Sequence, residues 1–223
     1  MSLPLPAAVL WDMDGTIIDS EHYWMRAERE LATQHGTSWN PEQGLALVGL
    51  SLYESSQIMK TQMGIRKLSV QEIIDFLTSR VIEQLREELP WRPGARELLL
   101  ECKSAGIPTA LVTMSMRVNA LEVAGNLGFA GFDVVVAGDD VTFGKPHPEP
   151  FLRAAELLNV DIEDCIAFED SPNGLASAEA SGAFAIAIPN IVPIPIAEGR
   201  IIWPTLAGIG LDDLRQVRNR RGD

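Results

Sequence analysis

The sequence predicts an α/β fold, with a doubly wound parallel sheet and an inserted block of helices. From Pro93 onward, short apolar runs alternate with helical patterns, which is typical of parallel strands joined by helices. Three apolar runs end directly in acidic or hydroxyl side chains, as strands do where a sheet edge carries a ligand site. Between the first of these runs and Pro93 the patterns are only helical. We therefore expect a Rossmann-like core of residues 1–18 and 90–223 and an inserted helical domain of residues 19–89.

The first apolar run, Ala7–Trp11, is the first expected strand, and four helices should follow it. Each helix begins at a side chain that can accept a hydrogen bond from the free amides of a first turn. These side chains are Asp19 or Ser20, Asn40, Ser51 and Ser69. Proline after Asn40, and glutamate three residues after each of the last two serines, strengthen the starts. The helices are expected at 20–36, 40–48, 51–64 and 69–89.

Strands and helices should alternate in the second half of the chain. The expected strands are 109–112, 132–137, 165–168 and 183–188, with an edge segment at 201–202. The expected helices are 94–105, 116–127, 148–158, 172–180 and 211–217. Because helical crossovers between parallel strands are right-handed, the carboxyl ends of the strands gather at one edge of the sheet. Asp12, Thr113 and Asp170 are therefore expected to lie there together.

Composition and charge narrow the class of protein. The chain has 223 residues, 46% hydrophobic and 22% charged, which allows a large buried core. Its net charge of −13 argues against a nucleic-acid partner, because phosphate backbones are bound through excess Lys and Arg. The most apolar stretch, Ala183–Ala197, contains three prolines and is too short to cross a bilayer. No membrane contact is expected.

The two cysteines and the N-terminal residues indicate the cellular compartment. Cys102 falls in a helical pattern and Cys165 in a strand, so both are expected to be buried thiols and not a disulfide. The N-terminal residues lack the basic start of a signal peptide. We expect a cytoplasmic protein that works as a monomer.

The stretch from Val9 to Thr16 carries the first candidate site. Asp12 and Asp14 follow the first expected strand, and residues two apart in extended chain face the same way. Gly15 permits a sharp turn and a close approach of the backbone to a ligand. Two crowded carboxylates are tolerable if a divalent cation lies between them or if their roles differ. Taken alone, the stretch fits equally well a strand that ends in an ordinary Asp-Gly turn.

Three later stretches decide between these interpretations. They are Ala110–Thr113, Gly144–Pro146 with Lys145 in a loop, and Ile166–Asp170. The order of aspartate pair, Thr, Lys and acidic pair resembles the haloacid dehalogenase-like hydrolase superfamily over nearly the whole chain. The continuations Ile17–Ser20 and Ser171–Gly174 are similar to the branch that holds β-phosphoglucomutase and small sugar-phosphate phosphatases. The resemblance implies that the helical insert is a cap that closes over the active site.

The resemblance assigns roles to the acidic residues. It implies that Asp12 is the nucleophile and that Asp14 is the general acid and base. It also implies a Mg²⁺ cofactor bound by the side chains of Asp12 and Asp170 and by the backbone carbonyl of Asp14. Glu169 would help directly or through water, and oxygen ligands suit Mg²⁺. Without the family, the acids at 169 and 170 could simply complement the dipole of a helix start.

The remaining candidates would contact the substrate. Thr113 is expected to hold phosphoryl oxygens, and Lys145 to balance the charge shared by nucleophile and phosphoryl group. Further candidates for substrate contact are Trp24, Tyr53, Met114, Ser115 and Arg117. The three histidines show no shared spacing for zinc.

The resemblance implies a Mg²⁺-dependent phosphatase of a small phosphorylated metabolite, a sugar or polyol phosphate, with an aspartyl-phosphate intermediate. The first alternative is a β-phosphoglucomutase-like isomerase that transfers the phosphoryl group. That pattern has a histidine on the first cap helix and an arginine after the cap turn, where this chain has Trp24 and Leu52. A dehalogenase is disfavoured because the family builds it without the second aspartate. A catalytically silent binding protein would predict a broken motif, whereas every core group is present.

Overall fold

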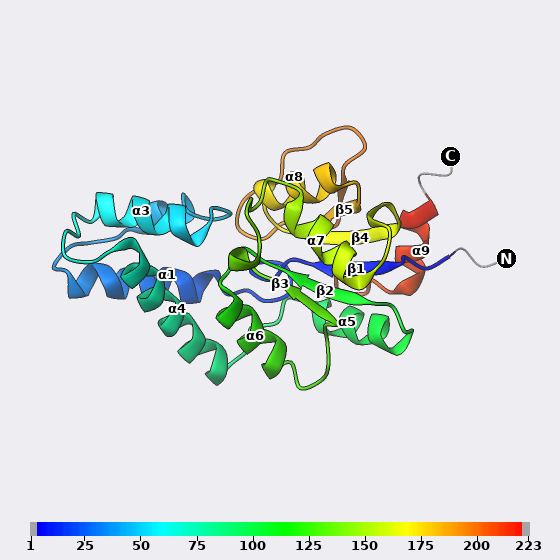
Figure 1. Ribbon diagram of the computed structural model, residues 1–223, viewed down its shortest axis with the longest axis horizontal. Helices are drawn as coiled ribbons and strands as arrows, with labels where there is room; N and C mark the ends of the chain where they lie inside the picture. The colour runs from blue at the N-terminus through cyan, green and yellow to red at the C-terminus, as the bar shows by residue number, and fades with distance from the viewer. Residues whose placement is uncertain (1–3, 220–223) are drawn as a thin grey trace.

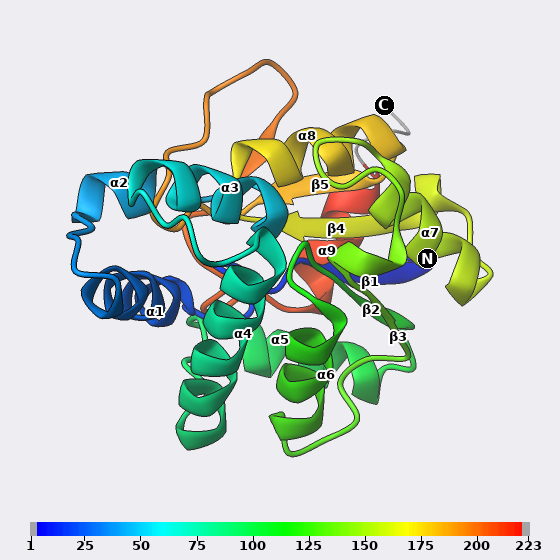
Figure 2. The same cartoon turned by 60° about the vertical axis from the view of Figure 1, so that its left-hand side comes forward.

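The computed structural model describes residues 4–219 and contains one parallel sheet with helices on both faces (Figures 1 and 2). The described strands form the order β3-β2-β1-β4-β5-β6, and each adjacent pair is parallel. The strands are β1 (Ala8–Trp11), β2 (Thr109–Val112), β3 (Val134–Val136), β4 (Cys165–Glu169), β5 (Phe184–Ala187) and β6 (Ile201–Ile202). The predicted α/β fold class is confirmed. Within the described part of the chain, no helix is both long and apolar enough to cross a membrane.

Alternating side chains of the buried strands supply two cores. Val9 and Trp11 of β1 face one layer, and Ala8 and Leu10 face the other. The first layer is covered by α5 (Ala95–Ser104), α6 (Arg117–Asn126) and α9 (Leu211–Asn219). The second is covered by α7 (Glu149–Leu158) and α8 (Pro172–Ser181). Because both faces are covered, β1, β2 and β4 are buried along their whole length, as parallel strands usually are.

Four helices form the inserted cap, which extends from one side of the sheet (left in Figure 1). They are α1 (Glu21–Gln34), α2 (Pro41–Leu45), α3 (Leu52–Gln62) and α4 (Val70–Glu87). Apolar side chains of α1, α3 and α4 pack together and are continuous with the first layer of the sheet core; they include Leu31, Met59, Leu77 and Val81. Figure 2 shows α2 and α3 above α1, with α4 running beside α6.

The chain enters and leaves the cap through two neighbouring segments. Ile18 and Trp91 form an antiparallel bridge. The Asp19 amide donates to the carbonyl of Pro90 at 2.7 Å, and the Arg92 amide donates to that of Ile17 at 2.8 Å. This short ladder joins the two connections at the point where the cap meets the core.

Local hydrogen bonds explain where the helices begin. Ser51 and Ser69 make the expected capping boxes with the glutamate three positions later. Asn40, which was expected only as an N-cap, also makes a capping box, with Gln43. Ser20 lies at the N-cap of α1, but its side chain accepts no capping bond, and its hydroxyl donates to Asp14. The helix expected at 40–48 ends at Leu45, and the strand expected at 132–137 is reduced to β3. The remaining boundaries differ from the predicted ones by a few residues.

Candidate active site

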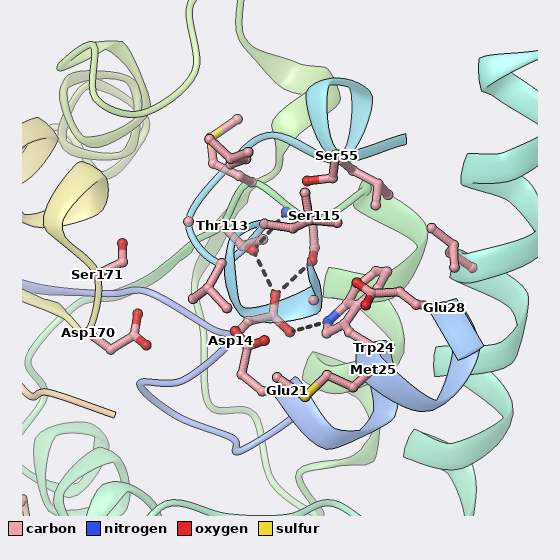
Figure 3. Close-up of a pocket in the computed structure, with 18 of the residues that line it drawn as sticks. Asp14, Glu21, Trp24, Met25, Glu28, Ser55, Thr113, Ser115, Asp170 and Ser171 are labelled. Carbon is pink, nitrogen blue, oxygen red and sulfur yellow. Dashed lines mark hydrogen bonds between the residues drawn. The ribbon is translucent and has the colours of Figure 1, made fainter. Parts of the chain in front are cut away.

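A cavity lies between the cap and the carboxyl edge of the sheet. Asp12 follows β1, Thr113 follows β2, and Asp170 follows β4, so three neighbouring strands deliver these side chains to one place. All three line the cavity, together with Lys145 from the loop before α7. The cap contributes side chains from α1, including Trp24 (Figure 3).

The buried ammonium group of Lys145 pairs with two of the acids. Lys145 Nζ lies 2.7 Å from Asp12 Oδ1 and 2.6 Å from Glu169 Oε1, and it also donates to the carbonyl of Val112 at 2.8 Å. Burial lowers the pKa of Lys145, but Asp12 and Glu169 outweigh it and raise the pKa above its usual value. Lys145 is therefore a fixed positive charge beside the first aspartate.

The acids outnumber this one cation. Carboxylate oxygens of Asp12, Glu169 and Asp170 lie within 4.8 Å of one another, and all three residues are buried. Burial, then the charge of Glu169, raises the pKa of Asp12 to about 7 despite Lys145. Burial, then the charges of Asp12 and Glu169, raises the pKa of Asp170 well above its usual value. Such a group of hard oxygen donors with excess negative charge could hold a metal ion.

Two glycines make room for the cluster. A side chain at Gly15 would meet Asp170 Oδ2 at 2.0 Å, and the φ angle of +87° at Gly15 also favours glycine. A side chain at Gly174, in the first turn of α8, would lie 2.0 Å from the carboxyl group of Glu169. Glu169 Oε2 accepts hydrogen bonds from the amides of Asp170 and Ser171 at 3.1 and 3.4 Å. The backbone thus packs directly against both acids.

Asp14 is held from several sides, as Figure 3 shows. Its Oδ1 accepts hydrogen bonds from the Ser20 hydroxyl and from Trp24 Nε1, the latter at 3.2 Å. Its Oδ2 accepts from Ser115 Oγ at 2.7 Å and from Thr113 Oγ1 at 3.5 Å. Two of these donors come from the start of the cap and two from the loop after β2, so Asp14 lies at their junction.

The loop after β2 is arranged by its own contacts. The Thr113 amide donates to the carbonyl of Val136 at 2.9 Å, which continues the sheet ladder. The Thr113 hydroxyl also accepts a hydrogen bond from the Ser115 amide at 3.0 Å. Met114 lines the cavity beside them, and its sulfur lies 3.4 Å from the amide of Lys145. Thr113, Met114 and Ser115 therefore surround the same space as Asp12 and Asp14.

The structure does not bring every candidate to the cavity. Arg117 begins α6, and its guanidinium group pairs with Asp140 at 2.5 Å on the outer surface. The guanidinium group also donates to the carbonyl of Val135 at 3.3 Å, and the amide of Arg117 donates to Asp139 Oδ1 at 2.8 Å, so these contacts hold Arg117 outside the cavity. Tyr53 is 56% exposed and does not line the cavity.

Sequence reasoning missed two acids of the cap that line the cavity, Glu21 and Glu28. Burial, then the charge of Asp14, raises the pKa of Glu21 to about 8. Burial raises the pKa of Glu28 to about 7. A signal was available for Glu28, because it lies next to the apolar positions 24, 27 and 31 on the buried side of its helix.

Comparison with known proteins places this chain in a family. A sequence model described as haloacid dehalogenase-like hydrolase matches residues 6–182. The chain is 34% identical over 180 residues to a phosphorylated carbohydrates phosphatase of Thermotoga maritima, covering 78% of this chain and 81% of the relative. It is 30% identical over 212 residues to hexitol phosphatase B of Escherichia coli (strain K12), covering 94% and 93%.

Solved structures also match this chain. CbbY from Rhodobacter sphaeroides in complex with phosphate superposes with a TM-score of 0.84 at 29% identity, covering 94% of this chain and 99% of that one. A β-phosphoglucomutase from Clostridium difficile has a TM-score of 0.83 at 23% identity, covering 97% and 99%, and shares the fold. The chain belongs to the haloacid dehalogenase-like hydrolase family. Within that family it is an enzyme, a phosphoric monoester hydrolase, as the resemblance of its motifs indicated.

Proposed function

We propose that this enzyme is a Mg²⁺-dependent phosphatase of a small sugar or polyol phosphate, with Asp12 as its nucleophile. The observation that carries the proposal is the difference between the two oxygens of the Asp12 carboxylate. Its Oδ1 pairs with Lys145 at 2.7 Å, whereas its buried Oδ2 has no hydrogen-bond partner among residues 4–219. The names of the relatives from Thermotoga maritima and Escherichia coli, a carbohydrate and a hexitol phosphatase, support the substrate class.

The proposed reaction has two steps. In the first, a carboxylate oxygen of Asp12 attacks phosphorus, the bond to the substrate oxygen breaks, and protonated Asp14 donates its proton to the departing alkoxide. In the second, water attacks phosphorus of the aspartyl-phosphate, Asp14 takes a proton from the water, and phosphate leaves with Asp12 restored. Lys145 and the hydroxyl of Thr113 stabilise the charge on the phosphoryl oxygens. Ser20, Trp24 and Ser115 orient Asp14 for both proton transfers.

The acidic cluster fits a divalent cation. Asp12 Oδ2 is buried without a partner, and the Asp170 carboxylate makes no hydrogen bond or ion pair within the described part of the chain. We propose that Asp12, Asp170 and the carbonyl of Asp14 hold Mg²⁺, which when bound would neutralise the acids and the phosphoryl group. Both oxygens of Glu169 already contact Lys145 or backbone amides, so we propose that it acts through water and orients these neighbours.

We also propose that residues 19–89 form the cap and residues 1–18 and 90–223 the core, of which 1–3 and 220–223 lie outside the described residues. The pairing of Asp19 with Pro90 and of Arg92 with Ile17 supports these boundaries. A monomer in the cytoplasm, without a nucleic-acid partner, stays a prediction.

The cavity favours the phosphatase over the isomerase. Among the described residues that line it, Lys145 at the reacting end is the only cation. Trp24 and Leu52 line the cap side, where the mutase pattern has histidine and arginine. A bisphosphate intermediate would lack a partner for its second phosphate, and each missing charge-assisted contact costs about 1.5–3 kcal/mol.

The enzyme is therefore expected to release phosphate from sugar and polyol monophosphates and not to convert β-glucose 1-phosphate into glucose 6-phosphate. Phosphate release is measured across a panel of monophosphates. A coupled glucose-6-phosphate dehydrogenase assay, with the bisphosphate supplied, measures the isomerisation. Interconversion faster than phosphate release would contradict the proposed phosphatase and favour the mutase.

A further inference from the structure

The cap wall of the cavity contains a buried acid that the reaction does not use. Glu28, on the second turn of α1, is 7% exposed and lines the cavity together with Trp24 and Met25. Figure 3 shows its carboxylate directed toward the other residues drawn around the cavity. A carboxyl group in this position is costly to bury, so it calls for an explanation.

Among the described residues, only one of the two oxygens of the Glu28 carboxyl group has a hydrogen-bond partner. Trp39 Nε1 donates to Glu28 Oε2 at 2.9 Å, and this is the one hydrogen bond that the Glu28 carboxyl makes within residues 4–219. Gly44 makes room for the same oxygen, since a side chain there would approach Oε2 at 2.9 Å. The second oxygen, Oε1, has no partner among those residues. The Glu28 side chain is thus held through Oε2, whereas Oε1 is open to a ligand.

The rest of the cap wall is mainly apolar, with the hydroxyl of Ser55 and a second acid, Glu21. Leu47, Met59 and Leu77 form part of an apolar surface, against which the C–H groups of a carbon chain can pack. Glu21 also lines the cavity, and its carboxyl makes no hydrogen bond or ion pair with any described residue. Among the described residues that line the cavity, Lys145 is the only cation, and the phosphoryl group would lie beside it.

We infer that Glu28 selects the leaving group, accepting a hydroxyl or ammonium group at its far end and disfavouring a carboxylate or a second phosphate there. The inference rests on the proposed phosphatase activity. A hydroxyl or ammonium donor satisfies Oε1, whereas an anion would meet Glu28 and Glu21 with no cation to offset them. The raised pKa of Glu28 adds to the fit, because a protonated carboxyl can also donate to a hydroxyl.

A matched pair of substrates tests this inference. Sorbitol 6-phosphate and 6-phosphogluconate differ only at the far carbon, which carries a hydroxyl in one and a carboxylate in the other. We expect kcat/KM for the alcohol to exceed that for the acid by about 30-fold or more, mainly through KM. Glu28→Gln keeps the shape and can still accept from Trp39, and it should lower this ratio by about tenfold.

The control is Glu42→Gln, which makes the same charge change at an exposed position of α2 outside the cavity. It should leave the ratio unchanged, because an exposed charge is screened by salt. The same pair is also measured as inhibitors of p-nitrophenyl phosphate hydrolysis, so that binding is compared even without turnover. An equal ratio in wild type and Glu28→Gln, a wild-type preference for the acid, or no binding of the alcohol would overturn the inference. Absence of phosphate release from p-nitrophenyl phosphate itself would instead contradict the proposed function.

Discussion

Replacing Asp12 with asparagine is expected to lower phosphate release by at least about 10⁴-fold, the scale on which loss of a covalent nucleophile reduces turnover. An amide oxygen cannot form the proposed aspartyl-phosphate, although it has nearly the same size and position. The matched comparison is Asp140→Asn, the same change at an acid that pairs with Arg117 on the outer surface. It should retain activity. Turnover of Asp12→Asn within tenfold of wild type would rule out Asp12 as the nucleophile.

The fold of Asp12→Asn should be preserved. The substitution removes one buried negative charge from a group of three acids, and Lys145 keeps its contacts with Glu169 and with the carbonyl of Val112. Because the lost ion pair was offset by the desolvation of Asp12, the free energy of unfolding should hold or rise. Circular dichroism and urea unfolding of the metal-free protein check this, and a large loss of stability would show that inactivity reflects misfolding.

Removing divalent cations is expected to lower activity by at least about 10²-fold, and adding Mg²⁺ should restore it. Without a cation, the phosphoryl group would approach Asp12, Glu169 and Asp170 with only Lys145 to offset their charge. Ca²⁺ should substitute poorly, because it takes more ligands at longer distances and would allow Asp12 to chelate it through both oxygens.

The measurement is phosphate release after treatment with EDTA, followed by titration with each cation. Asp170→Asn provides a matched test, since it should raise the Mg²⁺ concentration needed for half activity and leave the nucleophile in place. Full activity in EDTA, on protein shown by elemental analysis to be free of metal, would exclude the Mg²⁺ assignment.

Much of the fold could be predicted because its signals are local. Capping boxes at Ser51 and Ser69 depend on residues three positions apart, and buried strands appear as short apolar runs. The parallel arrangement follows from alternation of strands and helices, and it places Asp12, Thr113 and Asp170 at one edge. The family resemblance added the roles of these residues and the interpretation of the inserted helices as a cap over the active site.

What could not be predicted depends on contacts between distant segments. Arg117 follows the Thr113 loop closely in sequence, yet Asp140 holds its side chain on the outer surface. Asp19 or Ser20 was expected as a helix cap, but the Ser20 hydroxyl donates to Asp14, and its side chain accepts no hydrogen bond from a helix amide. The helical pattern could place Glu28 on the buried side of its helix, but its contact with Trp39 and the space that Gly44 leaves for it depend on a later segment.

The central claim is that the phosphoryl group passes through Asp12 with Asp14 as acid and base, and trapping that intermediate tests it most directly. Asp14→Asn should still attack p-nitrophenyl phosphate, whose leaving group needs no proton, but should activate water poorly for the second step. Mixing this variant with p-nitrophenyl phosphate and Mg²⁺ is expected to give a burst of p-nitrophenolate equal to the enzyme concentration. After acid quenching, mass spectrometry should find one added phosphoryl group on the peptide that contains Asp12. Steady release without a burst, with the Asp12 peptide unmodified or the phosphoryl group on another residue, would contradict the account.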